Sequence, residues 1–317
     1  MTKVGILIEI KNGGVKPACL GIISAAHDNK TERVALLMEE SSSESMEILE
    51  AHGIQRVVQI TSANGAIPWH AEQWAGAVVQ ALGHFNIQTL MGLASAQGKN
   101  ILSRVAARLG APLVMDCTAV DLSDHTAAKA QFSGKAAARF RTHGKYHLYG
   151  MRPNAIDPVA MPGEAILETF QAEIEETGIT VLDVQKGASS HVDLTEADVI
   201  ISGGRGMQNK DNFDILFKCA KEISAAVGAS RVAVDAGWVS HTMQVGQTGK
   251  TVSPKVYIAC GISGSVQHFA GMKTAGIIIA INHDPNAAIM HKCDFAVCAD
   301  LFDIIPALTR KLKNNKT

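Results

Sequence analysis

The chain has 317 residues, 47% of them hydrophobic and 19% charged, which suits two folded domains better than one. Its 29 basic and 30 acidic residues balance, so the charge favours neither a nucleic-acid partner nor an anionic membrane surface. No apolar run reaches the roughly 20 residues that span a bilayer, and because Glu9 interrupts the first one, the N-terminus is interpreted as a strand, not a signal peptide.

The six cysteines are widely spaced, and no CxxC pair occurs among them. The closest two, Cys293 and Cys298, are separated by four residues, a spacing that argues against a zinc or iron–sulfur site. Most of the cysteines stand among apolar residues, as small core residues do. A reducing compartment is therefore expected, and since the N-terminus does not resemble a transit peptide, the bacterial cytoplasm is favoured.

The first half alternates short apolar strands with helical stretches. Strands are predicted at 4–10, 33–39, 56–61, 89–95 and 112–122, and helices at 43–53, 69–85 and 100–110. Ser43 is a candidate N-cap for the first of these helices, and Gly53 is a candidate end. Strands separated by helices predict an α/β domain with a parallel sheet.

The pattern changes after this domain's fifth strand. Residues 131–151 are interpreted as an antiparallel addition, and the more polar stretch 157–187 carries Pro158 and Pro162. The domain boundary is placed near Lys186, which predicts domains at 1–186 and 187–317.

The second half repeats the strand–helix alternation. Strands are predicted at 197–204, 231–237, 256–261, 277–282 and 295–300, with helices at 212–227 and 301–313. Ligands of an open parallel sheet bind beyond the carboxyl ends of its strands. Glycine and small polar residues recur at those ends, at 202–206, 235–237, 261–265, 282–284 and 300–301, so the main cofactor is expected in the second half.

Gly261-Ile262-Ser263-Gly264-Ser265 follows a predicted strand and opens a helix, a layout that presents backbone N–H groups to an anion such as a dinucleotide pyrophosphate. The pattern is G-x-x-G and not the full G-x-G-x-x-G, so an ordinary turn stays an open alternative. Arg205 is a candidate phosphate ligand or a solvated loop arginine, and Arg231, which opens a predicted strand, is a candidate site residue or a surface arginine. His268 is a candidate site residue or an ordinary surface or core histidine. The long loop around 243–254 is a candidate functional loop or a plain surface excursion.

No motif of a hydrolase, a zinc protease or a P-loop nucleotidase occurs in the sequence.

Taken together, the motifs SGGRG (202–206), VGASR (227–231), MQVGQTGK (243–250), GISGSVQH (261–268) and ADLF (299–302) resemble the alpha subunit of electron transfer flavoprotein. The resemblance extends over nearly the whole chain and includes MRPNAI (151–156). It implies an N-terminal parallel-sheet α/β domain followed by a doubly wound FAD-binding domain.

The resemblance also implies which residues contact FAD. They are Arg205, Ser230, Arg231, Gln244, Val245, Gly246, Gln247, Thr248, Ser263, Gly264, Ser265, Val266, Gln267, His268, Asn282, Asp300 and Leu301. Thr248 is implied near flavin N5, and Arg231 and His268 are implied beside the isoalloxazine ring. A donor or cation there stabilises the negative charge of the reduced flavin.

An electron carrier needs no catalytic base, so the resemblance predicts a protein that is not an enzyme. It implies a heterodimer with a beta subunit that itself holds AMP. Implied donors are flavin dehydrogenases such as the acyl-CoA dehydrogenases of fatty acid beta-oxidation, and the implied acceptor is a quinone oxidoreductase.

Three alternatives stay open at this point. A bifurcating member of the family would take electrons from NADH and hold a second flavin in the partner subunit. An NAD-dependent dehydrogenase would need a Rossmann fingerprint, which the glycine spacing does not match. A non-redox nucleotide sensor would bind adenine nucleotides without flavin.

Overall fold

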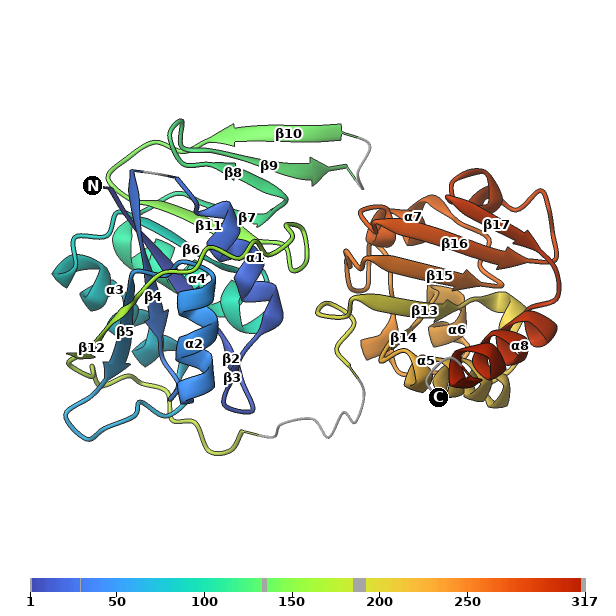
Figure 1. Cartoon of the computed structure of the whole chain (residues 1–317), viewed down its shortest axis with the longest axis horizontal. Helices are drawn as coiled ribbons and strands as arrows, with labels where there is room; N and C mark the ends of the chain where they lie inside the picture. The colour runs from blue at the N-terminus through green and yellow to red at the C-terminus, as the bar shows by residue number, and fades with distance from the viewer. Residues whose placement is uncertain (1, 29, 133–135, 185–191, 315–317) are drawn as a thin grey trace. The chain divides into compact units, whose positions relative to one another are not determined.

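The computed structural model describes residues 2–28, 30–132, 136–184 and 192–314, and divides into two compact units (Figure 1). The first comprises Met1–Ala130 and Ala137–Lys186; the second comprises Gly187–Thr317 with the short segment Gln131–Ala136. Each unit has its own parallel sheet and its own hydrophobic clusters.

A seven-stranded sheet forms the centre of the first unit, and all six of its strand pairings are parallel. From edge to edge the strands are β12 (Ile166–Gln171), β5 (Arg56–Thr61), β4 (Thr31–Leu37), β1 (Thr2–Ile8), β6 (Thr89–Leu93), β11 (His147–Met151) and β7 (Leu113–Cys117). The predicted α/β class with a parallel sheet is confirmed.

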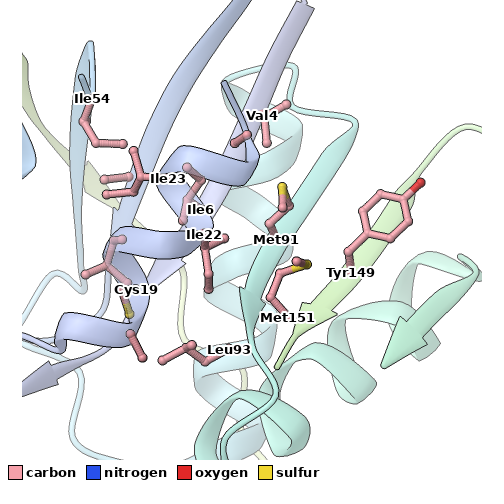
Figure 2. Close-up of a cluster of buried hydrophobic side chains, with 14 of the residues drawn as sticks. Val4, Ile6, Cys19, Ile22, Ile23, Ile54, Met91, Leu93, Tyr149 and Met151 are labelled. Carbon is pink, nitrogen blue, oxygen red and sulfur yellow. The ribbon is translucent and has the colours of Figure 1, made fainter. Parts of the chain in front are cut away.

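Side chains alternate along the strands, so both faces of this sheet carry apolar side chains, and helices cover both faces. Ile6 and Ile8 of β1 belong to a cluster with residues of α1 (Pro17–Ala25) and α2 (Ser43–Ala51), part of which Figure 2 shows. Leu7 belongs to the opposite cluster, with residues of α3 (Ala71–His84) and α4 (Ala96–Leu109). Each fully buried Ile or Leu contributes about 1.5–3 kcal/mol.

The sequence predictions for the stretches 131–151 and 157–187 need correction. Residues 131–151 do not form one antiparallel addition. β8 (Ala119–Asp121), β9 (Thr126–Gln131) and β10 (Ala136–Arg141) form a small separate sheet, in which β8 and β9 are antiparallel. The next strand, β11, is fully buried and joins the main sheet in parallel. Strand β12 lies in the polar stretch and was not predicted; it is an edge strand with mostly exposed side chains.

Smaller features of the first unit follow local rules. The N-cap of α2 is Ser42, not Ser43, and its side chain accepts from the N–H of Ser45. A two-strand hairpin, β2 (Ile10–Lys11) with β3 (Gly14–Val15), turns through Asn12 and Gly13, both at positive φ.

The second unit has a five-stranded parallel sheet in the order β14-β13-β15-β16-β17. Its strands are β13 (Val199–Gly203), β14 (Ala226–Ala229), β15 (Val256–Cys260), β16 (Ile277–Asn282) and β17 (Phe295–Cys298). After β14 the chain crosses back over β13 to form β15, so the sheet grows in both directions from β13. This is the predicted doubly wound topology.

Helices lie on both faces of the second sheet (Figure 1). α5 (Asp214–Glu222) and α8 (Leu301–Asn314) pack on the cluster around Ile201 and Ile258, and α7 (Val266–Met272) packs on the cluster around Ile200 and Tyr257. Short 3-10 helices at Arg205–Met207, Asp211–Phe213, His241–Met243 and Ala288–His291 complete the unit.

The strand predicted at 231–237 is wrong. The structure has a short helix, α6 (Arg231–Asp235), and the strand is β14, which the prediction placed inside a helix at 212–227. All four residues of β14 are buried, whereas α6 buries only Ala233 and leaves Val232 43% exposed. The four residues of β14 are buried beside β13 at the edge of the sheet. In the apparent alternation of Arg231-Val232-Ala233-Val234, only Ala233 is buried.

Candidate functional site

The carboxyl ends of β13 and β15 lie side by side where the strand order reverses, the usual ligand position in this topology. Gly204 donates its N–H to the carbonyl of Cys260 at 2.9 Å, and Gly206 donates to Gly261 at 3.0 Å. A Cβ on Gly206 would lie 2.7 Å from the Cα of Gly261. Glycine is required here because the two loops touch through their backbones.

Arg205 stands between these two glycines, at the start of a 3-10 turn. Its side chain is exposed and pairs with no acidic group among the residues that the structure describes. The cation therefore lies at the switch point with its charge uncompensated, as a phosphate ligand should.

The glycine loop between β15 and α7 is the second element of the site. Gly261 and Gly264 both have positive φ, at 59° and 79°. Within the described chain, no group accepts a hydrogen bond from the backbone N–H of Ser263, Gly264 or Ser265. Three unbonded N–H groups beyond the sheet fit an anionic group such as a pyrophosphate.

The loop at 244–250 is the third element, and it packs against both neighbouring segments. Val245 donates to the carbonyl of Ala229 at 2.9 Å, at the end of β14, and Gln247 donates to the carbonyl of Gln267 in α7 at 2.9 Å. Gln244 is buried and its Nε2 donates to Thr248 Oγ1 at 3.0 Å, which holds the exposed Thr248 in place.

Gly246 has a φ of 146° and lies against Gly271, where a Cβ would meet the backbone of Gly246 at 2.4 Å. The loop and α7 therefore approach through two glycines. The structure brings together the ends of β13, β14 and β15 with this loop, as the sequence motifs imply.

Ser230 and Arg231 follow β14. Ser230 donates its N–H to Gly203 at 2.9 Å, and its Oγ is buried with no hydrogen-bond partner among the described residues. Such an orphaned hydroxyl at the sheet edge fits a ligand that supplies the missing partner. Arg231 begins α6 and is exposed, and its Nε lies 3.1 Å from Asp235 Oδ2.

His268 lies in the first turn of α7 and is buried. Its Nε2 is 3.0 Å from the hydroxyl of Tyr257, which is itself fully buried. Burial lowers the pKa of His268 to about 4, although the nearby carbonyl of Val245 acts in the opposite direction. Nδ1 is shielded from solvent, and its geometry toward that carbonyl falls outside a hydrogen bond. At neutral pH the ring is therefore uncharged.

Asn282, Asp300 and Leu301 have mainly supporting contacts. Asn282 Nδ2 donates to the carbonyl of Ile262 at 3.0 Å, which braces the glycine loop. Asp300 Oδ1 accepts from the N–H of Phe302 at 2.8 Å at the start of α8. Leu301 is buried, and its Cδ2 lies 2.9 Å from the position of a Cβ on Gly261. The remaining predicted residue, Val266, is exposed at the first position of α7.

Among the described residues, the first sheet offers no comparable site at its carboxyl edge, because polar side chains there bond to one another. Buried Glu9 pairs with Lys16 at 2.6 Å and also contacts Ser95. Arg152 Nε donates to Asp116 at 2.9 Å. No group of metal-ligating side chains occurs among the described residues.

Sequence reasoning missed Tyr257 as a residue of the site and missed the pairing of Asp235 with Arg231. Tyr257 lies in the apolar strand predicted at 256–261, and nothing in the local pattern links it to His268. Asp235 is predicted at the carboxyl end of a strand at 231–237, whereas the helix α6 places it one turn from Arg231.

The fold and these three loops define a dinucleotide-binding α/β protein. Residues 193–273 match the family model described as electron transfer flavoprotein FAD-binding domain, and residues 4–181 match the electron transfer flavoprotein domain. The chain belongs to the family of electron transfer flavoprotein alpha subunits, whose members carry electrons and are not enzymes. Its cofactor is FAD.

Curated relatives agree over nearly the full length. The chain is 35% identical over 311 residues to the probable mitochondrial alpha subunit of Caenorhabditis elegans, covering 97% of this chain and 92% of that protein. It is 34% identical over 327 residues to the alpha subunit of Thermoanaerobacterium thermosaccharolyticum, at 99% and 98% coverage. For the alpha subunit of Pseudomonas aeruginosa the figures are 35% over 307 residues, at 96% and 98%.

An alpha subunit of this family pairs with a beta subunit. The described helices include none that is both long and apolar enough to cross a membrane.

Proposed function

We propose that FAD binds along the carboxyl edge of the second sheet and is held by the residues that the family motifs imply. The observation that carries this proposal is the convergence of Arg205, the glycine loop and the loop at 244–250 on one edge, where the N–H groups of Ser263, Gly264 and Ser265 find no acceptor among the described residues. The flavin, when bound, supplies the electron-accepting ring. The protein contributes binding and electrostatic tuning.

The chain's own groups divide into two sets. Arg205 and the N–H groups of the glycine loop suit the pyrophosphate, because they are cationic or donate hydrogen bonds. Arg231, Thr248 and His268 suit the flavin ring, and the buried Ser230 hydroxyl supplies a further donor. Asn282, Asp300 and Leu301 hold the nucleotide end of the site by bracing the loops.

The proposed physiological role is electron transfer from flavin dehydrogenases, such as acyl-CoA dehydrogenases of fatty acid beta-oxidation, to a quinone oxidoreductase. The proposed partner is a beta subunit that holds AMP, and the proposed compartment is the bacterial cytoplasm. The family membership supports these proposals. We also propose domains at 1–186 and 187–317, which the division into compact units supports.

Co-expression with the beta-type subunit tests the proposal. The purified complex should be yellow, contain one FAD and one AMP per heterodimer, and accept electrons from a reduced acyl-CoA dehydrogenase. Two FAD molecules per heterodimer and reduction by NADH would instead indicate a bifurcating member of the family. A colourless complex that takes up no added FAD would refute the proposed site.

A further inference from the structure

A buried polar group lies behind the glycine loop, inside the hydrophobic cluster under α7. It consists of Ser202 on β13, Tyr257 on β15 and His268 on α7, all 5% exposed or less. Tyr257 Oη and His268 Nε2 are 3.0 Å apart. Ser202 Oγ forms no hydrogen bond to the described residues. It lies near enough to the Tyr257 hydroxyl to lower its pKa, although burial raises that pKa by more.

Gly228 makes room for Ser202 in this group. A Cβ on Gly228 would lie 3.0 Å from Ser202 Oγ and 3.1 Å from Val245 Cγ2. A larger residue at 228 would therefore press on both the serine and the loop at 244–250.

The protonation of the group follows from burial. Burial raises the pKa of Tyr257, so the hydroxyl keeps its proton, and burial lowers the pKa of His268, so the ring is neutral. A neutral imidazole has one N–H donor and one acceptor nitrogen. If the phenol donates to Nε2, the ring proton must reside on Nδ1, and the nearby Val245 carbonyl favours the same arrangement.

We propose that Tyr257 is a positioning residue that holds His268 in the Nδ1–H tautomer, so that Nδ1 is the ring's only N–H donor. The inference rests on the proposed function, since it concerns the same site. A purely structural Tyr257 would fill space in the cluster without selecting a tautomer, and the two roles predict different spectra.

The tautomer is measured by 15N NMR on the alpha–beta complex with 15N-labelled histidine, before FAD is added. His268→Gln identifies the signals of the ring. In the unsubstituted protein Nε2 should resonate as an acceptor nitrogen and Nδ1 as a protonated one. In Tyr257→Phe the tautomer ratio should shift toward Nε2–H by roughly fivefold to tenfold, the equivalent of one neutral hydrogen bond.

Tyr149→Phe is the matched control. Tyr149 is also fully buried, and its hydroxyl bonds to Thr142 in the first unit, so its loss should leave the His268 signals unchanged. A protonated Nε2 in the unsubstituted protein would overturn the proposal even if Tyr257→Phe failed to fold. So would an unchanged tautomer in Tyr257→Phe.

A second measurement connects the tautomer to the cofactor. In the FAD-loaded complex, Tyr257→Phe should lower the potential of the first one-electron couple, in the same direction as His268→Gln. An unchanged potential alongside a changed tautomer would show that the tautomer of His268 does not tune the flavin. Failure to bind FAD at all would count against the proposed function and leave the NMR result standing as a separate test.

Discussion

Arg231 and Asp235 form an ion pair on one turn of α6, with Nε 3.1 Å from Oδ2, and both side chains are exposed. An exposed pair of this kind adds little to stability. The carboxylate nevertheless offsets the charge that Arg231 presents to the edge of the sheet. The family resemblance implies Arg231 as a source of positive field for the flavin, and the structure adds a residue that weakens it.

Asp235→Asn should therefore raise the potential of the first one-electron couple. We expect a rise of roughly 20–40 mV, equivalent to about 0.5–1 kcal/mol for one electron, and a smaller rise at high salt. Spectroelectrochemistry of the complex measures it. Asp198→Asn is the control, because Asp198 pairs with Lys255 at the opposite, amino edge of the sheet. Equal effects of both substitutions would contradict the assignment.

His268→Ala should lower the same potential. Loss of one hydrogen bond to a charged acceptor, about 1.5–3 kcal/mol, corresponds to about 60–130 mV. His84, an exposed residue at the end of α3, provides the control substitution His84→Ala. An unaltered potential in His268→Ala would refute a role for this ring beside the flavin.

Thr248→Val removes a hydroxyl while keeping the shape of the side chain. Because Thr248 is implied near flavin N5 and its Oγ1 is held by Gln244, the change should shift both one-electron couples. Thr242→Val, which alters an exposed hydroxyl bonded to Ser240, should shift neither. If Thr248→Val left both couples as they were, the implied contact with N5 would be wrong.

The outline of both sheets could be predicted because apolar runs and helical spacing are local signals. The predicted strands at 4–10, 33–39, 56–61 and 89–95 all correspond to strands of the structure. The exchange between β14 and α6 could not be predicted, since Arg231–Val234 shows the alternation of a strand while the buried Ala226–Ala229 continues a helical stretch. Burial, which decides between them, is set by neighbours distant in sequence.

The candidate site shows the same division. The glycines and Arg205 could be found because loops that touch through their backbones leave a glycine signature. The hydrogen bond between Tyr257 and His268 could not be found in this way, since it joins β15 to the helix α7 that follows the glycine loop. Likewise, the pairing of Arg231 with Asp235 depends on helical spacing that the strand prediction excluded.

Gly271→Ala should weaken FAD binding. The added Cβ would lie 2.4 Å from the backbone of Gly246, so the loop at 244–250 must move away from α7. Overpacking of this kind costs about 1–3 kcal/mol, which predicts a rise in the Kd for FAD of roughly fivefold to more than a hundredfold. Titration of the FAD-free complex measures it. Gly83→Ala in α3, where a Cβ meets nothing within 4 Å, should leave the Kd unchanged.

The buried, neutral ring of His268 predicts a loss of stability in acid. Its pKa is about 4 in the folded protein and 6.5 without burial, so between these values the unfolded chain binds more protons. The contribution of this ring to the free energy of unfolding should be fully present above about pH 6.5. It should fall as the pH drops, by about 2 kcal/mol at pH 5 and roughly 3 kcal/mol below pH 4.

Urea unfolding of the unsubstituted protein and His268→Gln, compared at about pH 7.5 and pH 5, isolates this contribution. Glutamine does not titrate, so between these two pH values the unsubstituted protein should lose about 2 kcal/mol more stability than His268→Gln. His147 is a second buried histidine with a lowered pKa, caused first by burial and then by His125 and His143, but it lies in the first unit. His147→Gln should reduce the acid sensitivity of the first unit alone. A stability difference between His268→Gln and the unsubstituted protein that did not change with pH would show that the ring titrates normally in the folded state.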